Sequence, residues 1–219
     1  MPAVWSVKMV NDQILALCEL SNDLLYSKIP ADKVSYYIDS SLAAGRAAAK
    51  EYAGMDIQEL YQINGIEIEY CKEHKSTFGV VLRGQMVMGE EAKVELYSAS
   101  IESLAKNSCI YDLPSMDYNM ALHIHLAHEF FHFLEHKNKS FVSEGLDTVV
   151  IMKLFGLCRK AHINRCSEIA AHAFAKELLH LPYLPNLYDY AYLINTGKMT
   201  QEGLSDFLQS MEQCLREPL

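Results

Sequence analysis

Histidine is concentrated in one short part of this 219-residue chain. Of nine histidines, five fall within fourteen residues, and they are His123, His125, His128, His132 and His136. Residues 128–132 of this stretch have the pattern H-E-x-x-H. On an α-helix, residues four apart lie about 40° from each other and one turn along the axis. Two histidines so placed can bind one tetrahedral zinc ion, so the spacing predicts a metal site.

The residue between the two histidines that could do chemistry is Glu129. It lies about 100° around the helix from His128, too far displaced to be the natural third ligand. Its carboxylate can still reach a water molecule held by the metal, which is the position of the general base in a zinc hydrolase. Apolar residues flank the motif, and unpaired His and Glu side chains would be costly in a buried helix unless a metal bound them.

A second motif overlaps the first on the same helix. Residues 132–136 read H-x-x-E-H, the inverted motif, which offers the same spacing of two histidines. Spacing alone does not separate these two possibilities. The metzincin extension is excluded, because it requires glycine at 135 and histidine at 138, where this chain has Glu135 and Asn138.

A third ligand must come from another segment. Glu168 and His172 are four apart in CSEIAAHAFAKELLHLP and would share one face of a helix. Glu144 and Asp147 are nearer to the motif in sequence, but they stand at an expected helix start, where acidic residues commonly complement the helix dipole. Glu168 and His172 are therefore the candidates.

The elements that must position these residues change from helices to strands and back. Apolar spacing predicts a helix within 11–27, a second that stops near Gly54, and a short one capped by Asp56. Residues 66–99 alternate apolar and polar side chains or are rich in β-formers between glycines, which predicts three or four short strands.

The remainder of the chain has helical periodicity. A long helix is expected from Ser115 or Asp117 to about Lys137. Further helices are expected over residues 144–159, 164–180, 186–195 and 200–215. Helices, a small sheet and helices again, without βαβ alternation, predict an α+β fold.

Composition limits the class of function. Nineteen basic and 28 acidic residues give a net charge of −9, so we expect no nucleic-acid partner and no anionic membrane surface. We also expect no signal peptide and no membrane span, because no apolar stretch is long enough. The six cysteines contain no C-x-x-C pair, and we expect reduced, mostly buried thiols in a cytoplasmic protein.

Two segments together resemble the ImmA/IrrE group of zinc metallopeptidases. HEFFHFLEH followed by EIAAHAFAKELL is similar to that group's H-E-x-x-H helix and its second motif, E-x-E-A-N-x-F-A-x-E-L-L-M-P. Glu168 falls on the leading glutamate of the second motif, and the resemblance covers about residues 40–182. It implies that His128, His132 and Glu168 bind Zn²⁺, that Glu129 is the catalytic base, and that the first motif is the correct one.

The resemblance also implies the organisation of the chain. It predicts one zincin-like domain over residues 1–219, of the gluzincin type. Its parts would be N-terminal helices (1–54), a small three- to four-stranded antiparallel sheet (65–99), catalytic helices (115–182) and C-terminal helices (183–219).

The implied function is that of a zinc-dependent metalloendopeptidase hydrolysing a protein or peptide, with a DNA-binding repressor as one such substrate.

The chain departs from the group at Phe131, where glycine is usual, at Ala170, where a second acidic residue is usual, and at His172, where asparagine is usual. An alternative is therefore a non-catalytic zinc-binding or structural protein with a degenerate site. His172 could orient a ligand or replace Glu168 as one. No oligomeric state follows from the sequence.

Overall fold

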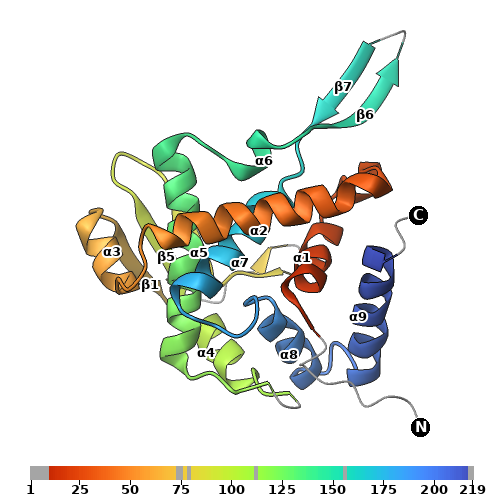
Figure 1. Cartoon of the computed structure of the whole chain (residues 1–219). Helices are drawn as coiled ribbons and strands as arrows, with labels where there is room; N and C mark the ends of the chain where they lie inside the picture. Colours follow the sequence, from red (N-terminus) through yellow and green to blue (C-terminus); the bar gives the residue numbers. More distant parts are fainter. Residues whose placement is uncertain (1–9, 73–75, 78–79, 111–112, 155–156, 217–219) are drawn as a thin grey trace.

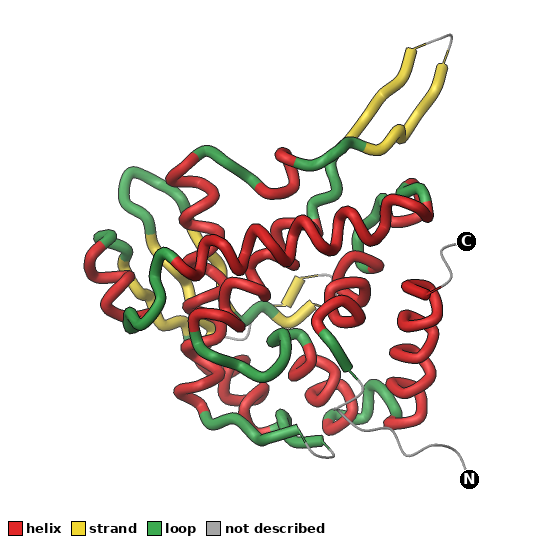
Figure 2. Tube along the Cα trace, viewed as in Figure 1, coloured by secondary structure: helices red, strands yellow, loops and turns green. Residues whose placement is uncertain are grey.

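The computed structural model describes residues 10–72, 76–77, 80–110, 113–154 and 157–216. Long helices and small sheets make up this part of the chain, as Figures 1 and 2 show, so the predicted α+β class is confirmed. Three helices form the centre: α2 (Val34–Lys50), α5 (Tyr118–Asn138) and α7 (Arg165–Leu178). α7 packs on both of the others, and therefore carries its side chains against the H-E-x-x-H helix.

The helices α2 and α7 approach each other closely at Gly45. A Cβ atom placed on Gly45 would lie 2.1 Å from the carbonyl oxygen of Ala170 and 2.9 Å from the Cβ of Ala173. Real Cβ atoms do not come so close to backbone oxygen, so only glycine fits between the two helices in this arrangement.

Replacing Gly45 by alanine should therefore destabilise the protein. Alanine favours a helix by about 1 kcal/mol over glycine, but the added methyl group must push α2 away from α7. We expect a net loss of about 3 kcal/mol in the free energy of unfolding, at the upper end of the usual cost of overpacking, measured by urea denaturation. Ala47→Ser, at an exposed position of the same helix, is the control and should change stability by less than about 0.5 kcal/mol. A Gly45→Ala protein as stable as the parent would contradict this packing.

Three strands form a mixed sheet in the order β1-β5-β4. β5 (Lys93–Tyr97) lies in the middle, parallel to β1 (Glu67–Cys71) and antiparallel to β4 (Gly84–Val87). A separate two-stranded ladder joins β2 (Ser76–Thr77) and β3 (Val80–Val81). The prediction of one antiparallel sheet was therefore wrong in part. Side-chain alternation predicts strands but does not indicate whether two strands run parallel or antiparallel. Here the chain forms β2, β3 and β4 before β5, which then pairs in parallel with β1.

The segment between α5 and α7 differs most from expectation. A helix was predicted over 144–159, but the chain forms only a short helix, α6 (Val142–Gly145), and then a hairpin of β6 (Val149–Leu154) and β7 (Leu157–Ala161). The β-branched run Val149-Val150-Ile151 favours strands. Figure 1 shows the hairpin projecting from the body, so most of its side chains have no core to face and helical periodicity was misleading there.

Most of the remaining helices lie where the sequence predicts them. α3 (Ile57–Ile63) is capped by Asp56, whose carboxylate accepts from the backbone N–H groups of Gln58 and Glu59. α1 ends earlier than the periodicity suggested, and short 3-10 turns follow it before α2. The other bounds are α1 (Asp12–Ser21), η2 (Tyr26–Lys28), η3 (Ala31–Lys33), α4 (Ser98–Lys106), α8 (Leu187–Asn195) and α9 (Gln201–Arg216).

Within the described ranges, no helix has both the length and the apolar character needed to cross a membrane. The thiols are less buried than predicted: Cys18 and Cys166 lie in the core, whereas Cys109, Cys158 and Cys214 are exposed. Cys158, for example, belongs to the projecting hairpin.

Candidate metal centre

The helix α5 presents the H-E-x-x-H residues from the centre of the molecule. It begins after Asp117, whose carboxylate accepts from the N–H of Met120 at 2.8 Å, so the predicted cap is confirmed. Phe130 and Phe131 of the motif are buried and pack against Phe174 of α7. This packing leaves His128 and His132 half-buried, on the wall of a cavity that faces α7.

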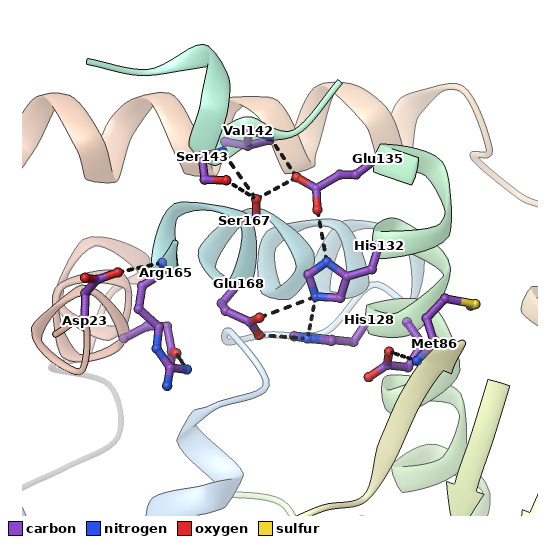
Figure 3. A network of polar contacts seen from close by, with 12 residues as sticks. Asp23, Met86, His128, His132, Glu135, Val142, Ser143, Arg165, Ser167 and Glu168 are labelled. Carbon is purple, nitrogen blue, oxygen red and sulfur yellow. Dashed lines mark hydrogen bonds and ion pairs between the residues drawn. The ribbon is translucent and has the colours of Figure 1, made fainter. Parts of the chain in front are cut away.

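Three side chains from the two helices converge at this wall. The Nε2 atoms of His128 and His132 are 3.2 Å apart. Glu168 of α7 places one carboxylate oxygen 3.2 Å from the His128 Nε2 and the other 3.7 Å from the His132 Nε2. Figure 3 shows both rings and this carboxylate pointing toward one another. Of the described His, Cys, Asp and Glu side chains, these three form the group whose ligand atoms could hold one metal ion.

The distances between these atoms match those expected around a tetrahedral zinc ion. Zinc bonds to histidine and carboxylate are about 2.0–2.1 Å long, which puts two ligands of one tetrahedron about 3.3 Å apart. The three separations between His128, His132 and Glu168, at 3.2, 3.2 and 3.7 Å, are close to that value. The three atoms therefore need only small movements to share one ion.

The electrostatic surroundings of this group favour positive charge. Burial lowers the pKa of His132, but its contacts with Glu135 and Glu168 outweigh burial and raise the pKa to about 10. Burial opposes ionisation of Glu168, but contacts with His128 and His132 outweigh burial and hold its pKa well below the usual range. Glu135 and Glu168 thus create a negative potential beside His132, which would also attract a divalent cation.

A buried carboxylate orients His132. The side chain of Glu135 is only 4% exposed, and one of its oxygens accepts from the Nδ1–H of His132 at 3.0 Å. The other oxygen accepts from the N–H of Val142 at 2.8 Å and from the hydroxyl of Ser167 at 2.7 Å, as Figure 3 shows. Because Glu135 holds the proton on Nδ1, Nε2 is the ring atom of His132 that would bind a metal in place of a proton, as in many ligating histidines.

This role for Glu135 was missed at the level of sequence, where His172 was the candidate for orienting a ligand. The signal was present in the overlapping H-x-x-E-H motif, since residues three apart on a helix are neighbours. The second histidine of that motif, His136, is exposed and lies outside the converging group. The structure therefore uses the glutamate of the overlapping motif but does not bring both of its histidines together with Glu168.

Glu129 faces the sheet as well as the cavity. Its carboxylate accepts from the N–H of Met86 on β4 at 2.7 Å, and it lines the same cavity as the three converging residues. β4 comes near because residue 84 is glycine: a Cβ there would lie 3.2 Å from the Cγ of Glu129. The edge strand thus holds the carboxylate of Glu129 beside the candidate metal ligands.

The cavity that contains these groups has a volume of about 630 Å³. Its walls come from β4, α5, α7 and α8 and include both acidic and basic side chains. His125 and His136 of α5 both belong to its lining.

His172 lies beside the converging group. Its ring is 4.8 Å from the ring of His128, and its Nδ1 is buried without a hydrogen-bond partner. Burial lowers the pKa of His172 well below its usual value, so the ring is neutral. The group of possible ligands found among the described residues includes Glu168 but not His172.

Glu144, Asp147 and several other histidines do not belong to the converging group. Glu144 is exposed on α6, and Asp147 pairs with Lys33 at 3.1 Å on the surface. His123 contacts Gln58, His162 contacts the carbonyl of Ser143, and His74 falls outside the described residues.

Two of the residues that depart from the ImmA/IrrE motifs are buried between helices. Phe131, at the usual glycine position, is buried against Phe174, with ring centroids 5.6 Å apart. Ala170, at the position of the second acidic residue, is buried where α7 meets Gly45 of α2. Both residues pack between helices, and neither belongs to the converging group.

Comparison of the chain with protein families, with curated proteins and with solved structures finds no match. The similarity to the ImmA/IrrE group consequently remains a prediction based on the motif residues.

Proposed function

We propose that this protein is a zinc-dependent metallopeptidase with His128, His132 and Glu168 as zinc ligands and Glu129 as general base. The observation that supports it best is the convergence of the three ligand atoms at separations of 3.2 to 3.7 Å. Glu129 lines the same cavity. These positions support the proposed roles of the four residues.

The chemistry of the ligand atoms supports zinc as the metal. Two imidazole nitrogens and one carboxylate oxygen form the ligand set of several catalytic zinc sites, which keep a fourth position open for water or substrate. Magnesium and calcium prefer ligand sets made only of oxygen. Glu135 supplies the hydrogen-bonded carboxylate that supports such a site from behind one of its histidines.

The proposed zinc ligands and Glu129 would have separate roles in peptide hydrolysis. A zinc ion held at the three ligands would polarise the scissile carbonyl and make a water molecule more acidic. Glu129 takes the proton from the attacking water and delivers it to the amine that leaves. The N–H of Met86 keeps one oxygen of Glu129 fixed, so the other oxygen is available for this proton.

The cavity supports a peptide or protein segment as the substrate. It is about 630 Å³ in volume, within the size range of small-molecule and peptide sites. The net charge of −9 is compatible with a basic protein substrate, such as a DNA-binding repressor.

The non-catalytic alternative is less well supported. A purely structural zinc site needs no general base, yet Glu129 is retained and positioned by β4 beside the candidate ligands. Phe131 and Ala170, which depart from the ImmA/IrrE motifs, pack between helices. The three candidate ligands converge despite these two residues.

Metal content and activity of the purified protein test the proposal directly. We expect about one zinc per chain by elemental analysis, and cleavage of peptides from a mixed library detected by mass spectrometry. A chelator should stop cleavage, and added zinc should restore it, because both treatments change only the metal and leave the three ligand side chains unaltered. A chain with no affinity for zinc would overturn the proposal, and a zinc-loaded chain that cuts no peptide would favour the structural alternative.

A further inference from the structure

One arginine stands in the same cavity as the candidate metal centre. Arg83 directly precedes β4, and its neighbour Gly84 packs against the general base Glu129. The Arg83 side chain is only 14% exposed and lines the cavity. The proposed function gives this arginine no role.

The guanidinium of Arg83 is held in place but is not fully paired. It forms an ion pair with Asp189 of α8 and lies 5.2 Å from the ring centroid of Tyr192. Its Nε is buried without a hydrogen-bond partner. An arginine carries five N–H donors in a planar fork suited to a carboxylate, and a buried donor left unpaired is costly. The guanidinium of Arg83 therefore has donor capacity that Asp189 leaves unsatisfied, on a residue that lines the cavity.

The other arginine of the cavity has a more buried partner. Arg165 binds the carboxylate of Glu19 at 2.7 Å. Glu19 has an 11% exposed side chain, whereas the Asp189 side chain is 43% exposed. Asp189 can therefore turn toward water and be replaced by another carboxylate, while Glu19 cannot without leaving a buried charge unpaired.

The charge of Arg83 acts close to the proposed catalytic residues. Burial first, and the positive charge of Arg83 second, lower the pKa of His125 to about 4. His125 lies three residues before His128 on α5, about 4.5 Å along the helix axis. An extended peptide advances about 3.3 Å per residue, so a group bound at Arg83 would be only a few residues from the metal ligands.

We propose that Arg83 binds a carboxylate of the substrate near the bond that is cut, and that Asp189 holds the guanidinium until this carboxylate displaces it. The inference rests on the proposed function and names the class of substrate: a peptide with a carboxylate close to the scissile bond. The carboxylate can be the C-terminal group of the peptide or the side chain of Asp or Glu, because the guanidinium recognises both in the same way.

Peptide selection on a non-cleaving protein tests this inference independently of catalysis. Zinc-treated Glu129→Gln protein would be immobilised and incubated with a random peptide library, prepared once with free C-termini and once with C-terminal amides. Bound peptides would be sequenced by mass spectrometry. We expect roughly 10- to 100-fold enrichment of a carboxylate at one fixed position, the range typical of hydrogen bonds to charged groups. Loss of enrichment in the amide library identifies the C-terminal carboxylate, and persistence identifies an acidic side chain.

Substitutions then assign the enrichment to Arg83. Added to the Glu129→Gln background, Arg83→Met should abolish it, whereas Arg165→Met, the matched control, should keep it. Asp189→Asn removes the competing carboxylate and should strengthen the enrichment. This variant still tests the inference if Arg83→Met fails to fold. The inference is overturned if no carboxylate is enriched, if Arg83→Met binds the same peptides as its parent, or if only Arg165→Met loses the preference. Selection by Arg83 without cleavage by the unaltered chain would instead refute the proposed function alone.

Discussion

Glu129→Gln should abolish peptide cleavage and leave zinc binding nearly unchanged. The amide has the same shape as the carboxylate, and its oxygen can still accept from the N–H of Met86, so the local structure is kept. It cannot take a proton from water at neutral pH, and a positioned general base contributes about 10²- to 10⁴-fold to the rate. We expect a loss of at least about 100-fold.

The measurement is the rate of cleavage of a peptide cut by the unaltered chain, with zinc content determined on the same samples. Glu59→Gln, an exposed position on α3, makes the same chemical change far from the cavity and should retain full activity. If Glu129→Gln cleaved as fast as the parent protein, Glu129 would not be the base, whatever the metal content.

Glu168→Ala should lower zinc affinity sharply. The substitution removes one of three converging ligands and leaves His128 and His132 alone, and it also removes negative charge from their surroundings. Losing only an orienting partner of a ligand typically costs about 10- to 100-fold in metal affinity. We therefore expect Glu168→Ala to cost more than about 100-fold, and Glu135→Gln, which affects only the partner of His132, to cost less than Glu168→Ala.

Competition with a chromogenic chelator measures these affinities. Glu177→Ala, an exposed glutamate on the same helix, serves as the control and should bind zinc like the parent. His172→Ala separates the two candidate third ligands. Full affinity in Glu168→Ala together with a large loss in His172→Ala would transfer the third ligand position to His172.

Local features of the fold were predictable from the sequence because they depend on neighbouring residues. The cap at Asp117, the long helix after it and the short helix after Asp56 follow from hydrogen bonds within a few residues. The side-by-side placement of His128 and His132 follows from helix geometry in the same way. The strands β6 and β7 were missed because they project from the body, where helical periodicity no longer indicates a buried face.

The direction of the strands was not accessible from alternation. Whether β1 lies parallel or antiparallel to β5 depends on the path of the chain between them, through a two-stranded ladder and β4. The same path brings the N–H of Met86 to Glu129, a contact between residues 43 positions apart. No local pattern encodes such a contact.

The sequence by itself determined the pair of histidines, the glutamate between them and the helix that carries all three, because backbone hydrogen bonding sets these relations within one element. The tertiary structure alone decided which acidic residue meets that pair. Glu168 reaches His128 and His132 because α7 packs on α5, with its opposite face seated against Gly45 of α2. It also decided that Glu135 supports His132, since the groups that fix this carboxylate come from α6 and α7. Convergence of separate elements is a property of packing, which sequence spacing does not record.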